Sequence, residues 1–350
     1  MLVARPASAL ALAALLCAPA TPAASPAPSL PGAAWVNLST RELRESYDVL
    51  WAVSDLHGGL AQLEDLLLAA RLAMRPQGSR TLAWNASARR QLLVAAGDYI
   101  NGGDSSVQVV LLLKDLQAQA ARAGSRIVLL LGNNEAEFLS DPEKEATKEL
   151  MKSAQAAAPR LKVGDKVKPK ELHGSEFGQF LRKMSVGAVV GTWLFAHAGY
   201  IDVKVGDKGG APELRRWAGK LSEGLRSGGE KAYQELLDEK SILAFHNWWR
   251  DEGKLAGMRK KLALLGLNGL VIGHDPDALG ALGTLAQDRS GWLIKLDTGI
   301  KDGASRGRML RCNVASITTA EGALRMASAP GKPSCQQLTP QGRLAPLTVR

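Results

Sequence analysis

Residues 49–59 read Val-Leu-Trp-Ala-Val-Ser-Asp-Leu-His-Gly-Gly, and this stretch indicates both a fold class and a chemistry. The five apolar residues Val49–Val53 are typical of a buried β-strand. Directly after them come Asp55 and His57, whose i, i+2 spacing points both side chains to the same side of an extended chain. The stretch therefore predicts a strand that ends in a converging carboxylate and imidazole.

The same pattern, a short apolar run followed by polar residues and glycine, returns along the chain. It predicts further strands over Leu92–Ala96, Ile127–Leu131, Trp193–Ala196, Leu270–Ile272 and Trp292–Leu296. Between the first runs, residues 60–73 and 107–123 carry apolar residues at helical spacing and predict amphipathic helices. Strands that alternate with helices predict an α/β fold in which helices flank a sheet.

Side chains suited to metal binding follow five of the predicted strands. Because the carboxyl ends of strands gather functional groups in open α/β sheets, we expect these side chains to lie close together. A single Gly-Asp is usually a turn and a single His is usually structural, but three of the five histidines stand at strand ends, which favours a common site. The segments in question are Ser54–Gly59, Gly97–Gly103, Gly132–Glu135, His197–Gly199 and Gly273–Pro276.

In this order the motifs resemble those of the calcineurin-like metallophosphoesterases, and within them the protein-phosphatase-like branch that includes the bacterial Shewanella-like phosphatases. The motifs of that family run D-x-H-G, G-D-x-x-D-R-G, G-N-H-E, H-x-G and G-H, and the resemblance spans about residues 48–300. It implies a four-layer αββα sandwich of two mixed β-sheets flanked by helices. A dinuclear metal centre would lie on the loops between the sheets.

The resemblance also implies six metal ligands. Asp55 and His57 would bind the first ion, Asp98 would bridge both ions, and Asn133, His197 and His274 would hold the second. Oxygen donors mixed with imidazole suit Mn, Fe or Zn better than Ca or Mg. Two such ions would clamp a phosphoryl oxygen and lower the pKa of a bridging water, so that hydroxide can attack phosphorus near neutral pH.

The sequence departs from the family at three positions that assist catalysis. Asn134 replaces the histidine of G-N-H-E, and Asn101 and Gly102 replace the second aspartate and the arginine of G-D-x-x-D-R-G. In the family that histidine, supported by the aspartate, protonates the leaving oxygen, and losing a positioned acid typically removes about 10²–10⁴-fold in rate. Because both partners have become Asn, we interpret the change as a concerted replacement by an amide pair.

The missing arginine would have gripped the substrate phosphate, and Arg250 is its predicted replacement. The segment Phe245–Arg250 resembles the later arginine-bearing stretch of the family, and a guanidinium offers a fork of donors to phosphate. The alternatives for Arg250 are stacking on Trp248 or Trp249 and an ion pair with Asp251.

Three other polar positions near the motifs are less informative. His246 is either a substitute acid or, as we favour, a structural residue. His173 lies in a polar, lysine-rich segment and is expected to be solvated. Asp297-Thr298-Gly299 ends the last predicted strand and is interpreted as a turn near the metals.

The first 24 residues predict a secretory signal peptide, because Arg5 precedes the apolar run Ala9–Ala18 and small residues follow it. The protein is therefore expected to be secreted or periplasmic, with lipidation at Cys17 as the less favoured alternative. The apolar run is shorter than the roughly 20 residues of a membrane span, so no transmembrane segment is expected.

The rest of the chain is predicted to comprise a proline-rich linker over residues 25–46, the phosphoesterase domain over 47–320 and a C-terminal tail over 321–350. Insertions are expected near 141–180 and 203–240. The first is rich in lysine and is interpreted as a solvated helical hairpin, with an anion-binding surface as the alternative.

Cys312 and Cys335 are the two cysteines that remain once the signal peptide is removed. A disulfide that pins the tail and a pair of free thiols are equally favoured alternatives.

Composition limits the function classes. With 46% hydrophobic and 22% charged residues in 350, the chain is expected to be globular rather than disordered, collagen-like or disulfide-dense. The net charge of +10 favours anionic partners, but no nucleic-acid module accompanies it and none is expected. Two classes remain: a metal-dependent phosphatase for phosphorylated small molecules or proteins, favouring good leaving groups, and a pseudo-phosphatase that binds phosphate without turnover.

Overall fold

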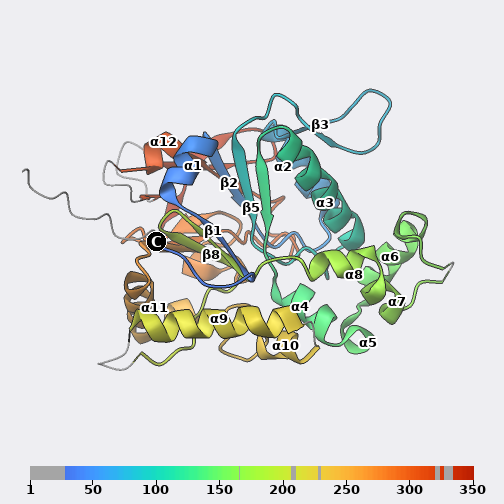
Figure 1. Ribbon diagram of the computed structural model, residues 1–350. Helices are drawn as coiled ribbons and strands as arrows, with labels where there is room; N and C mark the ends of the chain where they lie inside the picture. The colour runs from blue at the N-terminus through green and yellow to red at the C-terminus, as the bar shows by residue number, and fades with distance from the viewer. Residues whose placement is uncertain (1–27, 165, 206–209, 228–229, 320–323, 327–333) are drawn as a thin grey trace, which may run out of the picture.

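The computed structural model describes residues 28–164, 166–205, 210–227, 230–319, 324–326 and 334–350 (Figure 1). The predicted signal peptide lies outside these residues. Among the helices in the described ranges, none has both the length and the apolar composition needed to cross a membrane.

A six-stranded mixed sheet has the first predicted strand near its centre. β2 (Val49–Val53) pairs in parallel with β5 (Gln91–Ala95), and β5 pairs in parallel with β6 (Arg126–Leu129). On its other side β2 pairs antiparallel with β12 (Met309–Asn313), after which the sheet continues through β13 (Cys335–Leu338) and β14 (Leu344–Pro346). The sequence patterns predicted the parallel half of this sheet and missed the antiparallel half.

The second large sheet has seven strands, and three adjacent ones were predicted. β8 (Trp193–Ala196), β9 (Gly269–Ile272) and β11 (Leu293–Lys295) run parallel to one another. The edge strands come from segments that the patterns missed, and a separate small hairpin stands outside both sheets. The additional strands are β1 (Trp35–Leu38), β7 (Gly187–Val190), β10 (Ala286–Gln287) and β15 (Thr348–Val349) in the sheet, and β3 (Ala73–Met74) and β4 (Ala83–Trp84) in the hairpin.

Alternating side chains divide each central strand between two cores. Leu50 and Ala52 of β2 face the core between the sheets, whereas Trp51 and Val53 belong to the core on the helix side. In β8, Trp193 and Phe195 belong to the inter-sheet core in the same way. A strand that is buried on both faces reads as a continuous apolar run, which is why these strands were visible in the sequence.

Helices cover the outer faces of the two sheets. α2 and α3 lie along one side of β2 and β5, and α9 and α11 lie beyond β1 and β8 on the other side (Figure 1). This layered arrangement confirms the predicted four-layer α/β fold. The helices are α1 (Thr40–Ser46), α2 (Leu60–Ala69), α3 (Ser106–Arg122), α4 (Asn133–Ser140), α5 (Pro142–Glu145), α6 (Lys148–Leu161), α7 (Pro169–Gly174), α8 (Glu176–Leu181), α9 (Ala211–Ser227), α10 (Glu230–Glu235), η1 (Trp248–Arg250), α11 (Glu252–Leu264), η2 (Ala278–Gly280) and α12 (Val314–Ile317).

The linker predicted over residues 25–46 is wrong for much of its length. Leu30 is buried, β1 extends the seven-stranded sheet, and the Trp35 indole N–H donates to the Ala218 carbonyl. Proline content suggested an extended linker, but a short edge strand can form wherever it finds a neighbouring strand, here β7.

The predicted tail over residues 321–350 also belongs to the fold in part. β13 and β14 complete one sheet and β15 completes the other. Cys312 and Cys335 stand opposite each other on β12 and β13 and form a disulfide, the first of the two alternatives left open by the sequence.

The lysine-rich segment is not a solvated hairpin. It forms α5 to α8, and α6 buries Leu150, Ala154 and Leu161 on its inner face. The Ser153 hydroxyl of this helix accepts a hydrogen bond from the backbone N–H of Val107 in α3, which ties the segment to the main body.

The solvated position predicted for His173 is also wrong. Its ring packs edge-on against Phe138, and Nε2 lies 2.6 Å from the Arg182 guanidinium. Burial and this nearby charge lower the pKa of His173.

Candidate metal centre

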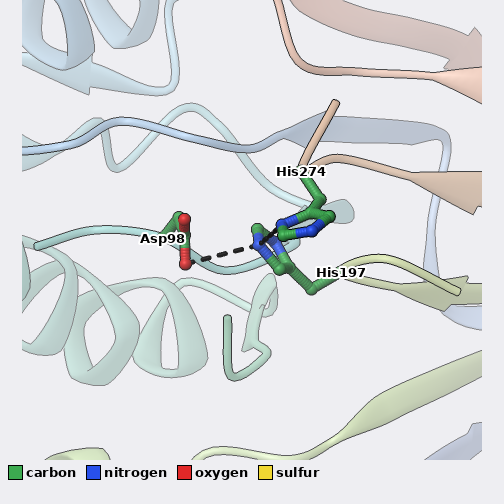
Figure 2. A group of neighbouring side chains, drawn as sticks. All are labelled: Asp98, His197 and His274. Atoms are coloured by element: carbon green, nitrogen blue, oxygen red, sulfur yellow. Dashed lines mark hydrogen bonds and ion pairs between the residues drawn. The ribbon is translucent and has the colours of Figure 1, made fainter. Parts of the chain in front are cut away.

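Two overlapping groups of buried acids and histidines lie at the ends of the central strands. One consists of Asp55, His57 and Asp98, and the other of Asp98, His197 and His274; within each group the candidate ligand atoms lie within 4.8 Å of one another. Figure 2 shows the second group, with Asp98 facing His197 and His274 beside them. Asp98 lies 3.6 Å from His57 Nε2 and 3.3 Å from His197 Nε2, so one carboxylate serves both groups.

Asn133, the sixth predicted ligand, is the first residue of α4. Its Oδ1 lies 3.0 Å from His197 Nε2, and its Nδ2 donates to Glu137 Oε1 at 3.1 Å. The hydrogen bond to Glu137 keeps the amide oxygen, the atom that could bind a metal ion, toward the histidines.

Backbone carbonyls orient two of the imidazoles. His57 Nδ1 lies 2.8 Å from the Asn101 carbonyl oxygen, and His197 Nδ1 lies 2.8 Å from that of Ala96. When each Nδ1 carries the proton and donates it to the carbonyl, each Nε2 keeps a free lone pair. Such a partner on the far nitrogen is usual for histidines that bind metals.

The site also contains polar atoms that protein groups alone do not satisfy. His274 Nδ1 faces His197 Nε2 at 3.1 Å, and the other nitrogen of His274 is buried without a hydrogen-bond partner in the described part of the chain. Two ring nitrogens that face each other need a shared proton or a cation between them. The donor set therefore fits metal ions.

Backbone conformation at the strand ends is unusual. Four of the six candidate ligands have left-handed backbone angles, with φ of 55° at Asp55, 43° at His57, 55° at Asp98 and 68° at His274. Such angles in residues other than glycine cost about 1–3 kcal/mol each and persist only where the surrounding structure imposes them.

Neighbouring glycines leave the space that these carboxylates occupy. A Cβ on Gly132 would lie 2.1 Å from Asp98 Oδ1, and one on Gly273 would lie 2.3 Å from Asp55 Oδ2.

In the absence of metal ions, neighbouring acids and histidines of the site have pKa values shifted in opposite directions. Burial, followed by the charge of Asp297, raises the pKa of Asp55 well above its ordinary value. Burial acts the same way on Asp98, but His197 outweighs it and lowers the pKa of Asp98. Burial alone would lower the pKa of His197, yet Asp98 and Asp55 raise it to about 10, while burial and His197 lower that of His274 to about 3. A divalent cation would satisfy both carboxylates and neutral imidazoles at once.

Asn134 and Asn101 form the amide pair that the sequence suggested. Asn134 Nδ2 donates to Asp98 Oδ2 at 2.5 Å, and Asn101 Nδ2 donates to Asn134 Oδ1 at 3.1 Å. The Thr147 hydroxyl then donates to Asn101 Oδ1 at 3.0 Å. We call this chain of hydrogen bonds from Thr147 through Asn101 and Asn134 to Asp98 the amide relay; none of its three side chains titrates.

Glu135 organises the loops around the candidate metal ligands, a role that the sequence did not reveal. The buried carboxylate accepts backbone N–H bonds from Asp98, Tyr99 and Gly132 at 2.8–2.9 Å, and from Ile100 at 3.2 Å. Burial and Asp98 raise its pKa to about 7. Its place in the G-N-N-E motif was the only signal available.

Lys295 and Asp297 are two more buried polar residues beside the site. Lys295 Nζ donates to the carbonyl oxygens of Pro276 and Ala281 and so holds the loop that follows His274; burial lowers its pKa to about 8. Asp297 accepts from Gly299 N–H, as a turn residue does, but it also lines the cavity next to the candidate metal ligands, and burial raises its pKa.

Arg250 does not line this cavity. It stacks on Trp249 at 4.8 Å and forms an ion pair with Asp277 at 2.5 Å. Stacking was one of the alternatives considered from the sequence, whereas the ionic partner was expected to be Asp251.

His246 does line the cavity. Its ring stacks on His274, with centroids 3.8 Å apart, and Nδ1 lies 2.8 Å from Asp275 Oδ1.

Residues 49–288 match the family model of the calcineurin-like phosphoesterases. This match covers well over half of the chain, so the chain belongs to that family, as the motifs predicted. It is a phosphoesterase-family protein whose Asp and His groups are positioned to bind two metal ions.

Solved structures with the same fold include phosphatases. A cold-active protein-tyrosine phosphatase of a psychrophilic Shewanella species is 18% identical, with a TM-score of 0.61 over 90% of this chain and 82% of that one. A second structure of a cold-active protein tyrosine phosphatase is 18% identical, with a TM-score of 0.58 over 89% of this chain and 79% of the other. At this identity the likeness shows the fold alone.

An uncharacterised protein of Schizosaccharomyces pombe is 33% identical over 87 residues. That match covers a quarter of each chain.

Proposed function

We propose that the protein hydrolyses phosphomonoesters with two metal ions held by Asp55, His57, Asp98, Asn133, His197 and His274. The observation that carries the proposal is that Asp98 belongs to both ligand groups. When bound, two ions such as Mn, Fe or Zn supply Lewis-acid activation of the phosphoryl group and of the attacking water. The substrates are phosphorylated small molecules or phosphoproteins.

The amide relay narrows the substrate class further. Asn134 stands beside the Asp98 carboxylate but cannot release a proton to a leaving oxygen. Esters whose leaving group departs as a stable anion need little protonation. We therefore propose that aryl phosphates, including phosphotyrosine, are better substrates than alkyl phosphates.

The test combines metal analysis with hydrolysis assays on the purified protein. We expect two metal ions per chain and metal-dependent release of 4-nitrophenol from 4-nitrophenyl phosphate. Asp98→Asn should lose two-metal binding and hydrolysis together, because a neutral amide no longer balances two adjacent cations. Asp115→Asn, which removes a surface carboxylate paired with Arg160, is the matched control and should leave both unchanged.

A pseudo-phosphatase is the second candidate, and the amide relay is the observation that favours it. Such a protein would bind two metals and phosphate tightly but would show no metal-dependent hydrolysis even of an aryl phosphate. That result would overturn the enzyme proposal and establish the binding function instead.

We also propose that the protein works in a secreted or periplasmic compartment. The disulfide between Cys312 and Cys335 supports this, because disulfides persist mainly in oxidising environments. Cell fractionation should recover the protein outside the cytoplasm with residues 1–24 removed; an intact N-terminus in the cytoplasmic fraction would contradict it.

A further inference from the structure

The cavity beside the metal ligands has an unusual balance of charge. It measures about 240 Å³, and Asp98, Asp297 and Asp302 all contribute to its wall. Among the described residues that line it, Lys301 is the one lysine or arginine. A phosphomonoester carries up to two negative charges. With two metal ions balancing Asp98, the carboxylates of Asp297 and Asp302 still oppose its entry at the cavity wall, and a positive group there favours it.

The backbone at Lys301 is held in place while its side chain remains free to act. Lys301 follows Ile300 in a turn closed by hydrogen bonds from Gly303 N to Ile300 O at 3.1 Å and from Ala304 N to Gly299 O at 2.9 Å. Lys301 takes part in none of the ion pairs among the described residues, whereas Arg250 is paired with Asp277. The ammonium group is therefore available to a ligand in the cavity.

Gly102 supplies a second, independent observation. Its φ of 145° lies in the region that favours glycine, and a Cβ there would lie 2.9 Å from His57 Cβ and 3.2 Å from Lys301 Cγ. The methylene stem of Lys301 thus runs against the backbone of Gly102. A Cβ at position 102 would displace His57 and would press on the stem of Lys301.

We infer that Lys301 binds the phosphoryl group of the substrate. The cation comes from the loop after β11 and occupies the side of the site where the family motif carries an arginine at position 102. A lysine ammonium is a compact charge on a flexible stem rather than a rigid fork, so it contributes attraction with less geometric selection than an arginine would. The inference deepens the proposed function and rests on it.

Calorimetric titration of the Mn²⁺-loaded protein with inorganic phosphate tests the inference without turnover. Lys301→Met keeps most of the stem and removes the charge, and we expect it to weaken phosphate binding roughly tenfold or more, the range for a hydrogen bond to a charged group. Lys301→Arg should stay within about threefold of the wild type. KM for 4-nitrophenyl phosphate should rise in parallel while kcat and metal content change little.

Lys260→Met is the matched control, because Lys260 is an exposed lysine of α11 that does not line the cavity. It should bind phosphate as the wild type does. Raising the salt concentration should narrow the difference between the wild type and Lys301→Met, since salt screens an exposed charge.

The outcomes separate this inference from the proposed function. If Lys301→Met still binds its metals and its phosphate affinity stays within twofold of the wild type, the inference about Lys301 is overturned and the proposed function is not. Weakened phosphate binding in a protein that hydrolyses nothing supports Lys301 and overturns the enzyme proposal. A metal-loaded wild type that neither binds phosphate nor hydrolyses 4-nitrophenyl phosphate overturns both.

Discussion

An asparagine at position 134 differs from a histidine in that its contact with Asp98 does not depend on pH. Asn134 Nδ2 always donates, and Asn101 holds the opposite end of the amide, so the orientation is unambiguous. The pair therefore keeps a hydrogen bond to the Asp98 carboxylate and cannot supply the proton that an acid would donate.

Restoring the acid tests this interpretation at the residue scale. In the wild type, kcat/KM should fall steeply as the leaving group changes from nitrophenol to an alkyl alcohol. Asn134→His combined with Asn101→Asp should flatten that trend and raise alkyl phosphate turnover by about 100-fold, within the range for a positioned acid. The measurement is a series of aryl and alkyl phosphates assayed at one pH. Equal wild-type rates across the series would show that another group donates the proton.

At the scale of single elements, α6 connects the helical insertion to the metal centre. Thr147 accepts a hydrogen bond from Leu150 N–H as the N-cap of this helix, and its hydroxyl proton begins the amide relay. The Thr147 hydroxyl thus accepts a hydrogen bond that caps α6 and donates one to Asn101 in the site.

Substitutions at Thr147 can separate these two roles. Thr147→Val removes the N-cap hydrogen bond, so the free energy of unfolding should fall by about 1 kcal/mol. It also removes the hydrogen bond to Asn101, so kcat/KM should fall several-fold. Thr147→Ser should resemble the wild type. Thr147→Asp keeps an acceptor for the cap but has no hydroxyl donor, so stability should recover while activity stays low. Recovery of both in Thr147→Asp would show that the cap alone matters.

The turn between β6 and α4 depends on having no side chain at Gly132. Gly132→Ala would bring a Cβ into Asp98 Oδ1 and the Asp98 backbone N, so we expect a loss of about 1–3 kcal/mol in stability and of metal binding. The matched control is Gly257→Ala in α11, where a Cβ would meet no atom within 4 Å. That change should be neutral or stabilising by up to about 1 kcal/mol. Urea unfolding and metal analysis of both variants distinguish a steric clash at Gly132 from a general cost of replacing glycine. Unchanged stability and metal binding in Gly132→Ala would show that no such clash exists.

On the scale of the whole molecule, the disulfide between Cys312 and Cys335 fastens a late strand to the six-stranded sheet. It closes a segment with a sequence separation of 23, and a loop of this length is expected to contribute about 3 kcal/mol. Changing both cysteines to alanine should lower the unfolding free energy by about that amount and leave the metal ligands unaffected. The wild type with its disulfide reduced should lose a similar amount of unfolding free energy in urea. If the urea midpoint is unchanged in both proteins, sheet pairing alone holds β13.

Local patterns predicted several strands that are buried on both faces, although they missed β7, whose four residues are all buried. Val49–Val53 and Trp193–Ala196 read as continuous apolar runs because both of their faces are covered. The same patterns missed β1 and β13, which lie toward the sheet edges and combine apolar with polar residues.

The sequence by itself determined the chain order of the central parallel strands and of the candidate metal ligands that follow them, because a strand, a turn and the next side chains lie within a few residues of one another. Tertiary structure alone decided that Asp297 and Lys301 reach the cavity of Asp98, that Arg250 is held by Asp277, and that Thr147 completes the amide relay. These contacts join segments separated by tens to hundreds of residues. They form only when the two sheets pack and bring distant loops to one edge, and no local periodicity encodes that event.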